Sequence, residues 1–170
     1  MLRRNLEVKA RCAQLTATRA AVHRLGARSG GVELQTDTYF VVPKGRLKLR
    51  EIQGQAPVLI AYDRPDRSEA RLSTYHLVPV RDAAVLKAAF ALTLSIRGEV
   101  HKRREIYLWR NVRIHLDEVA NLGTFVELEA VLTSDEGAIE APAHVTHLCQ
   151  ELMITPADQI APSYAELLGL

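Results

Sequence analysis

The sequence predicts an α+β fold that is mainly an antiparallel β-sheet, either open or closed into a barrel. Three observations favour this fold class. About eight segments have the composition or the two-residue period of strands, few segments have helical spacing, and the two kinds do not alternate regularly. A parallel sheet needs strand–helix–strand units, so neighbouring strands are expected to run antiparallel.

The size and composition are those of one globular domain, which we expect to span residues 1–170. Hydrophobic residues make up 48% of the chain and charged residues 25%, and 22 basic residues nearly balance 20 acidic ones. This balance argues against non-specific nucleic-acid binding, and an aromatic content of 5% argues against a stacking platform for single strands. No apolar run reaches membrane length, and no secretion signal is visible, so we expect a cytoplasmic protein without a membrane partner.

In the first half of the chain, one helix is expected among five strands. Residues 5–12 alternate apolar and polar side chains, which is the period of a strand. Residues 15–27 place apolar side chains at helical spacing, and Gly26 can end that helix. Residues 28–36 are expected to be a loop. Four more strands are expected where β-branched, aromatic or alternating residues recur, at 36–42, 46–52, 57–65 and 70–80.

In the second half, three strands are expected to follow one another between helical segments. Residues 82–96 read as a helix, and Asp82 is a suitable N-cap for it. The three strands are separated only by short turns and are expected at 99–110, 111–119 and 123–132. Two further segments have helical spacing, at 142–154 and 163–170.

Charged and apolar side chains alternate on four of the expected strands. The segment NLEVKAR is the first example, and its polar face carries Asn5, Glu7, Lys9 and Arg11. The polar faces of the other three carry Arg46, Lys48 and Arg50, then Arg113, His115 and Asp117, and finally Glu127 and Glu129. Residues 99–107 carry charge on both faces. Their period does not decide whether Lys102 and Arg104, or His101, Arg103 and Glu105, share a side with the others.

Two interpretations of these charged faces are open from the pattern alone. In the first, the apolar faces form the core and the charged faces meet water, as in many antiparallel sheets. In the second, the sheet closes with its charged faces inward and helices cover the apolar outer faces. Charges inside a barrel are costly unless they are paired or bind a ligand. A mixture of bases and acids there would suit a polyanion together with a divalent cation.

The chain resembles the CYTH superfamily, the triphosphate tunnel metalloenzymes, in an ordered series of segments. NLEVK (5–9) is similar to the E-x-E-x-K signature of that family. The other segments follow in the family's order: DTYF (37–40), GRLKLRE (45–51), LIAYDRPD (59–66), VHKRREIY (100–107), RIHLDEVANLGTFVELE (113–129) and SYAELL (163–168). The resemblance covers nearly the whole chain. It implies an eight-stranded antiparallel barrel with flanking helices, in which the charged faces line a tunnel.

The resemblance also implies roles for the charged residues of such a tunnel. Basic residues would bind the triphosphate, namely Lys9, Arg46, Lys48, Arg50, Arg64, Lys102, Arg104 and Arg113. Acidic residues would hold Mg²⁺ or Mn²⁺, namely Glu7, Asp117, Glu127 and Glu129, with Asn5 as a further candidate. Lys9, Arg64 and Asp117 would take part in catalysis.

The chain departs from the family signature at Asn5, which stands where the first Glu of E-x-E-x-K is expected. An amide oxygen can still coordinate a hard cation, but it carries no negative charge. A metal site that relies on this position should therefore be weaker than in the family pattern.

Three functions are compatible with this resemblance. The first is a class IV adenylate cyclase-like enzyme, favoured by GRLKLRE and RIHLDEVANLGTFVELE, which would convert ATP into cyclic AMP and pyrophosphate. The second is a hydrolase of tripolyphosphate, thiamine triphosphate or a nucleoside triphosphate. The third is a non-catalytic binder of polyphosphate or nucleotide, suggested by Asn5. In each case the partner is a small molecule that contains a triphosphate, and the resemblance also makes a homodimer an expectation.

Other reactive side chains receive structural interpretations. His115 is expected to line the tunnel or accept a hydrogen bond, with a ligand or base role as the alternative. His144 and His147 are expected on a solvated helix face, since no third metal ligand lies at matching spacing. Tyr39, Tyr75 and Trp109 are expected to pack, and Ser73 has no Ser-His-Asp context. The two cysteines, Cys12 and Cys149, form no C-x-x-C motif, so neither a disulfide nor a zinc site is expected.

Overall fold

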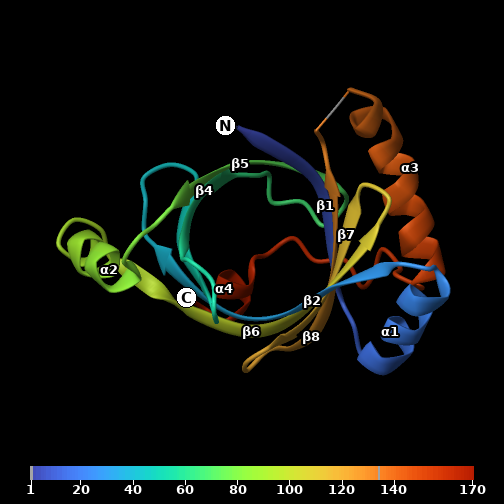
Figure 1. The fold of residues 1–170 in the computed structure, drawn as a ribbon, viewed down its shortest axis with the longest axis horizontal. Coiled ribbons are helices and arrows are strands. Elements are labelled where there is room, and N and C mark those ends of the chain that lie inside the picture. The colour runs from blue at the N-terminus through green and yellow to red at the C-terminus, as the bar shows by residue number, and fades with distance from the viewer. Residues whose placement is uncertain (1, 134) are drawn as a thin grey trace.

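A computed structural model describes residues 2–133 and 135–170, and its eight antiparallel strands close into a barrel (Figure 1). Around the barrel the order is β1-β5-β4-β3-β2-β6-β7-β8. The strands are β1 (Arg3–Arg11), β2 (Arg28–Phe40), β3 (Arg46–Ile52), β4 (Val58–Asp63), β5 (Arg71–Pro79), β6 (Ile96–Trp109), β7 (Val112–Val119) and β8 (Gly123–Val131). The helices are α1 (Leu15–Arg24), α2 (Ala83–Ala91), α3 (Asp135–Glu151) and α4 (Tyr164–Leu167). The predicted closed barrel with flanking helices is confirmed.

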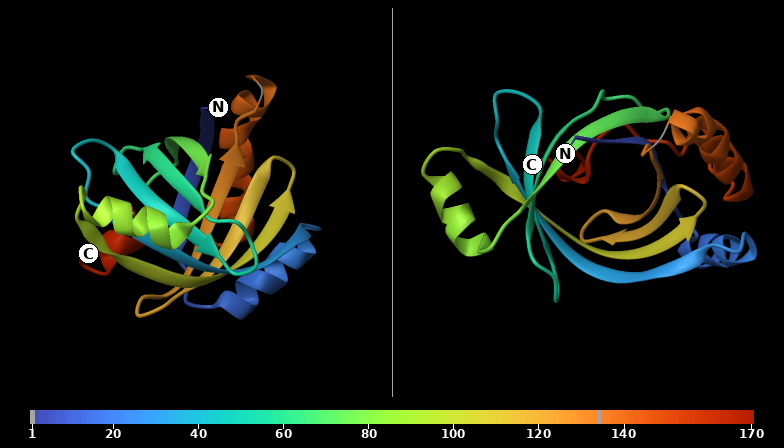
Figure 2. Two further views of the ribbon diagram at one scale, coloured as in Figure 1. Left: turned by 60° about the vertical axis from the view of Figure 1, so that its left-hand side comes forward. Right: turned by 45° about the horizontal axis from the view of Figure 1, so that its top comes forward.

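The main hydrophobic core lies outside the barrel. The apolar outer faces of β1, β7 and β8 pack against α1 and α3, which lie side by side on one flank, whereas α2 lies on the opposite flank (Figures 1 and 2). Ile114 and Leu128 of the strands, Val22 of α1 and Leu148 of α3 are all fully buried in this core. Since side chains alternate along a strand, the neighbours of these apolar residues must point into the barrel. The charged faces are therefore turned inward.

A second apolar cluster fills one end of the barrel interior. Inward-facing Tyr39, Val100 and Phe125 pack there against Tyr164 and Ala165 of α4. The segment before α4 joins the sheet through an antiparallel bridge between Ala10 and Gln159 and a hydrogen bond from the Ile160 amide to the Lys9 carbonyl at 2.9 Å. The C-terminal segment thus enters the barrel, as the position of α4 in Figure 1 shows.

The prediction of a loop at residues 28–36 is wrong, because these residues form the larger, N-terminal part of β2. The strand pairs with β6 along nearly its whole length, with a register shift between Ser29 and Gly31. A Cβ on Gly30 would lie only 3.0 Å from the Cγ2 atom of Ile106, so the glycine allows a close approach of the two strands. The glycines that suggested a loop therefore mark an irregularity within a strand.

The helices match the sequence in position but less well in extent. The predicted 82–96 helix ends at Ala91, and Ile96 already belongs to β6, although Asp82 caps α2 as expected by accepting a hydrogen bond from the Val85 amide. The 142–154 prediction placed a proline at the start of a helix, but α3 begins earlier and contains Pro142. The 163–170 helix shortens to α4, which Ser163 and Glu166 cap reciprocally.

Two further expectations concern cysteines and membrane helices. Cys12 is buried and Cys149 is half-buried, and both are unpaired, as predicted. None of the helices within the described residues is long and apolar enough to cross a membrane.

Candidate functional site

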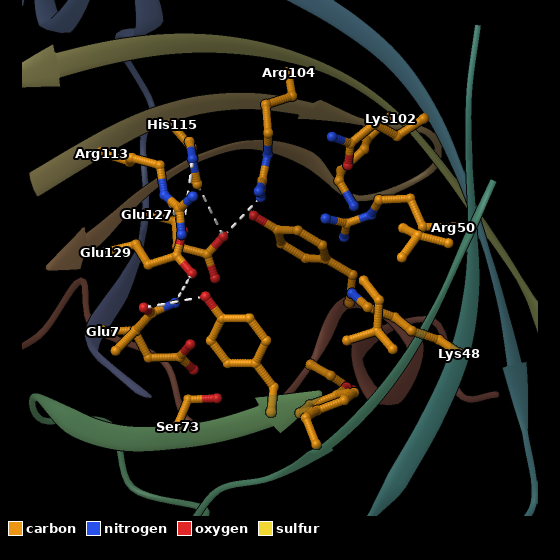
Figure 3. A pocket seen from close by; sticks show the side chains of 18 of the residues that line it. Glu7, Lys48, Arg50, Ser73, Lys102, Arg104, Arg113, His115, Glu127 and Glu129 are labelled. Carbon is orange, nitrogen blue, oxygen red and sulfur yellow. Dashed lines mark hydrogen bonds and ion pairs between the residues drawn. The ribbon is translucent and has the colours of Figure 1, made fainter. Parts of the chain in front are cut away.

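The inward faces of the strands surround a cavity of about 470 Å³, within the roughly 300–1,000 Å³ typical of small-molecule sites. Among residues 2–133 and 135–170, eight basic and four acidic side chains line it, so the lining carries an excess of positive charge. Acidic and basic side chains gather on different sides of the cavity, which we call its acidic wall and its basic wall. Figure 3 shows Glu7, Glu127 and Glu129 on one side of the cavity and Lys48, Arg50 and Lys102 on the other.

The acidic wall is formed by β1 and β8, the two strands whose pairing brings carboxylates together. Glu7 lies directly opposite Glu129, and Lys9 lies opposite Glu127, with 3.8 Å between the Lys9 Nζ and a Glu127 carboxylate oxygen. Asn5 donates a hydrogen bond to Glu129 through its side-chain nitrogen, and its oxygen accepts one from the Tyr75 hydroxyl at 3.3 Å. Asn5 is therefore part of this wall and holds one of its carboxylates.

The basic wall is organised around the fully buried carboxylate of Asp37 on β2. Arg50 donates to both of its oxygens at 2.7 Å, and the ammonium groups of Lys102 and Lys48 lie at 2.8 and 3.0 Å. Burial alone would raise the pKa of Asp37, but the charges of Arg50, Lys102 and Lys48 hold it well below its usual value. One anion thus holds three cations, and the cluster retains an excess of positive charge.

The two lysines of this cluster are poorly solvated. Burial, reinforced by the neighbouring positive charge of Arg50, lowers the pKa of Lys48 to about 7. Burial likewise lowers the pKa of Lys102 to about 8, although the nearby Asp37 acts in the opposite direction. Both lysines lie close to their titration points at neutral pH, so an anion that enters the cavity would favour their charged forms.

Arg104 connects the two walls. Its guanidinium binds Asp117 through two hydrogen bonds of 2.7 and 2.6 Å. It also donates to Glu127 at 2.7 Å (Figure 3). Asp117 is fully buried behind Arg104 and accepts a further hydrogen bond from the Tyr164 hydroxyl at 2.7 Å. Burial would raise the pKa of Asp117, but the Arg104 guanidinium lowers it. Asp117 therefore fixes Arg104 from behind and does not line the cavity.

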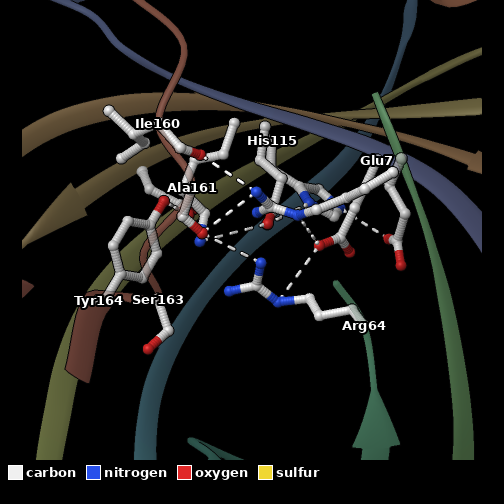
Figure 4. Close-up of polar contacts among 12 residues, drawn as sticks. Glu7, Arg64, His115, Ile160, Ala161, Ser163 and Tyr164 are labelled. Carbon is white, nitrogen blue, oxygen red and sulfur yellow. Dashed lines mark hydrogen bonds and ion pairs between the residues drawn. The ribbon is translucent and has the colours of Figure 1, made fainter. Parts of the chain in front are cut away.

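Two buried arginines hold Glu7 against the C-terminal segment (Figure 4). The Nε atoms of Arg71 and Arg64 lie 3.0 and 3.6 Å from a Glu7 carboxylate oxygen. Each also donates through Nη1 to the carbonyl of Ala161 at 3.1 Å, and Arg71 reaches the carbonyl of Ile160 at 3.2 Å. The position of Glu7 is thus tied to the position of the C-terminal segment.

A third wall is apolar and aromatic and lies on β4 and β5, between the acidic strand β1 and the basic strand β3. Ile60 pairs with Leu77 and Tyr62 pairs with Tyr75, and all four side chains line the cavity together with Val58. A site for a bare polyanion has no need of such a surface. The combination fits a ligand that is charged at one end and apolar or aromatic at the other.

Most of the residues predicted from the sequence meet in this cavity, and two do not. Lys102 and Arg104 point inward, which resolves the open question about residues 99–107. Arg46 lies outside the cavity lining, where it pairs with Asp66 at 2.6 Å, and Asp117 lies behind the lining. The predicted residues that line it are Asn5, Glu7, Lys9, Lys48, Arg50, Arg64, Lys102, Arg104, Arg113, Glu127 and Glu129.

Three residues of the site received no role from the sequence: Asp37, Arg71 and Tyr164. Asp37 lies in the DTYF segment, inside the strand expected at 36–42, and the two-residue period places it on the same face as Tyr39. Arg71 begins β5 on the same face as Ser73. Neither pattern indicates which ion pairs these side chains form, because their partners come from other strands.

The remaining side chains have structural surroundings. His115 is buried in the lining, with Nδ1 3.5 Å from Glu127, and Arg113 pairs with Glu129 at 2.9 Å. His144 and His147 both contact the ring of Trp109, and His144 Nδ1 hydrogen-bonds the Asn111 oxygen at 2.7 Å. These two histidines are thus packing residues, and only His147 is exposed as expected.

The donor set of the acidic wall suits a divalent cation, although the carboxylates are all engaged by bases. Glu7, Glu127 and Glu129 supply hard oxygen ligands from neighbouring positions of β1 and β8, which Mg²⁺ or Mn²⁺ prefers. Within the part of the chain that the structure describes, no three acidic, histidine or cysteine side chains already converge on one point. A cation would therefore replace arginine or amide partners of these carboxylates.

Comparisons with known proteins agree with this fold. The CYTH domain family model matches residues 3–164, so the chain belongs to the CYTH family. Members of this family are enzymes that act on triphosphates and generally use divalent metal ions. No curated protein matches the sequence.

Several solved structures share the fold. The PH1012 protein of Pyrococcus horikoshii OT3 is 25% identical with a TM-score of 0.83, over 96% of this chain and 98% of that one. A Vibrio parahaemolyticus protein named a "putative adenylate cyclase" is 18% identical with a TM-score of 0.78, over 98% of each chain. The Hippeastrum protein HpAC1, named a "putative adenylyl cyclase" and described as having a dominant triphosphatase activity, is 14% identical with a TM-score of 0.65. It matches over 98% of this chain and 93% of that one.

Proposed function

We propose that this protein is an adenylate cyclase-like enzyme that binds a nucleoside triphosphate in its tunnel and converts ATP into cyclic AMP and pyrophosphate. The observation that carries the proposal is the meeting of three walls in one cavity. The basic wall suits phosphates, the acidic wall suits a divalent cation, and the apolar and aromatic wall suits the nucleoside. Inorganic tripolyphosphate would leave the third wall without a partner.

In this proposal the basic residues align the triphosphate and neutralise its charge. Lys48, Arg50 and Lys102 would exchange part of their interaction with Asp37 for phosphate oxygens, and Arg104 is already aimed by Asp117. Glu7, Glu127 and Glu129 would hold Mg²⁺ or Mn²⁺, with Asn5 beside them. When bound, such an ion neutralises charge on phosphate oxygens and stabilises the charge that develops as a phosphorus–oxygen bond breaks.

The proposed reaction needs a group that accepts a proton from the ribose 3′-hydroxyl as that oxygen attacks the α-phosphorus and pyrophosphate leaves. Lys9 is suited to this role, because burial lowers the pKa of its ammonium group despite the nearby charge of Glu127. Arg64, buried beside Glu7, would contact a phosphate from the same side. Asp117, whose oxygens bind Arg104 and Tyr164, would act by orienting Arg104.

Hydrolysis of a triphosphate is the second candidate. The same walls would serve if water attacked the terminal phosphorus, because the alignment and neutralisation of charge are shared by both reactions. The fold-level likeness to HpAC1, with its dominant triphosphatase activity, favours testing this reaction beside cyclisation. A binder without turnover is the third candidate.

Product analysis separates these functions. The protein is incubated with ATP, tripolyphosphate and thiamine triphosphate, each with Mg²⁺ or Mn²⁺, and the products are identified by chromatography. Cyclic AMP with pyrophosphate is expected from ATP, whereas orthophosphate alone would refute the cyclase proposal and support the hydrolase. Arg104→Ala should abolish turnover, and the matched control Arg103→Ala should not, because Arg103 lies on the outer face and pairs with Glu118.

A further inference from the structure

Tyr164 joins the C-terminal segment to two separate parts of the charged cavity. It is the first residue of α4, its side chain is only 3% exposed, and its ring packs on Phe125 with 4.9 Å between ring centroids. It also lines the cavity. Its ring and its hydroxyl contact different charged residues, so their contributions can be separated by mutation.

The hydroxyl of Tyr164 acts on the acid that orients Arg104. It donates to the Asp117 Oδ2 atom at 2.7 Å, the oxygen that also accepts from Arg104 Nη2 at 2.6 Å. Asp117 has no exposed surface, and a fully buried carboxylate keeps its orientation only while its hydrogen-bond donors stay in place. Without this hydroxyl, the Asp117–Arg104 pair loses one of the donors that define its geometry.

The ring of Tyr164 acts on Lys9. The Lys9 ammonium lies over the ring face, 4.2 Å from its centroid, while Glu127, the anion with which it forms an ion pair, is 3.8 Å away. The face of an aromatic ring attracts a cation, most strongly where water is excluded. The ring therefore fixes the position of the Lys9 ammonium group beside Glu127.

We propose that Tyr164 is a positioning residue of the triphosphate site, its ring holding Lys9 and its hydroxyl holding Arg104 through Asp117. This inference rests on the proposed function, since it assumes that Lys9 and Arg104 meet the triphosphate. It makes the C-terminal segment a part of the site, consistent with the contacts of Arg64 and Arg71 with the carbonyl of Ala161.

Two substitutions of Tyr164 and one control test the inference. Tyr164→Phe removes only the hydroxyl, Tyr164→Leu removes the hydroxyl and the aromatic face, and Leu168→Ala loosens the same apolar cluster without touching either charged residue. Affinity for tripolyphosphate is measured by calorimetry, with the melting temperature of each variant as a measure of folding. Turnover of ATP is measured in parallel.

The expected result is a graded one. Tyr164→Phe should weaken tripolyphosphate binding about 10-fold, the size of one hydrogen bond to a charged pair. Tyr164→Leu should weaken it by about a further 10-fold, because Lys9 then also loses the aromatic face that holds its ammonium group. Leu168→Ala should lower the melting temperature and leave the affinity unchanged.

Failure of the positioning role of Tyr164 and failure of the proposed function would give different results. If the unaltered protein binds and turns over a triphosphate but both Tyr164 variants resemble Leu168→Ala, the positioning role is refuted and the proposed function stands. If the unaltered protein binds neither ATP nor tripolyphosphate, the proposed function fails, and the positioning role fails with it.

Discussion

Replacing Asp37 with asparagine tests whether one buried carboxylate holds the basic wall together. In the unaltered protein, Arg50, Lys102 and Lys48 each place a nitrogen atom within 3.0 Å of the Asp37 carboxylate. The substitution keeps the shape of the side chain but removes the negative charge that these three bases share. Breaking a buried ion pair from one side costs about 3–5 kcal/mol of unfolding free energy. For a chain of this length, that corresponds to a melting temperature lower by about 6–20 °C.

The pH dependence sharpens this prediction. Because the pKa of Lys48 is about 7 and that of Lys102 about 8, both lysines can escape the unpaired state at alkaline pH by losing a proton. The cost should therefore approach about 3 kcal/mol at pH 9 and the upper end of the range at pH 6. Below about pH 4 the difference should shrink, because the Asp37 carboxyl takes up a proton in the unfolded chain while its lowered pKa keeps it charged in the folded protein.

Urea unfolding of Asp37→Asn at pH 6 and pH 9 measures this cost, and Asp63→Asn, at an exposed position of β4, is the control. Tripolyphosphate should recover more stability in Asp37→Asn than in the unaltered protein, because it supplies the missing negative charge. A loss below about 0.5 kcal/mol, the scale of an ordinary surface substitution, would refute the role of Asp37. A larger loss at pH 9 than at pH 6 would refute the explanation through the lysines.

Three further predictions concern the metal and the phosphates. Glu127→Gln and Glu129→Gln should each lower Mg²⁺- or Mn²⁺-dependent product formation about 100-fold, whereas the outer-face control Glu118→Gln should not; full activity in both would remove the carboxylates from the metal site. Asn5→Glu should tighten Mn²⁺ binding about 10-fold in calorimetry, and unchanged affinity would place Asn5 outside the metal shell. Affinity for tripolyphosphate should fall between pH 6 and 8 as Lys48 loses its proton, and Lys48→Arg should flatten this fall because arginine stays charged.

The strands and their two faces were predictable from the sequence, but the inward direction of the charges was not. A strand with alternating charged and apolar residues has the same period whether its charged face meets water or a tunnel. The direction depends on which face the helices cover, and the core on the outer faces of β1, β7 and β8 brings together α1 from the first half of the chain and α3 from the second. Only the resemblance to the CYTH family predicted that the charged faces point inward.

A similar limit of the sequence pattern explains why two predicted site residues, Arg46 and Asp117, lie outside the cavity lining. Arg46 continues the period of Lys48 and Arg50, but it lies at the end of β3, where Asp66 and Glu166 are available to pair with it. Asp117 shares the face of Arg113, but it lies deeper in the barrel, where Arg104 and Tyr164 cover it. The period fixes the side of the sheet and leaves the depth along the barrel to the strand register.

Asn5 links the stability of the metal-free protein to its affinity for a divalent cation. Glu7 and Glu129 face each other across β1 and β8, and two carboxylates at this spacing repel unless a cation lies between them. The Asn5 amide donates to Glu129 and so holds it without adding charge, whereas a third carboxylate here would raise the repulsion in the metal-free protein. Asn5 therefore lowers the cost of the acidic wall in the absence of metal. The same change removes a negative charge that would otherwise attract the metal, so greater stability of the metal-free protein and weaker metal binding have one cause.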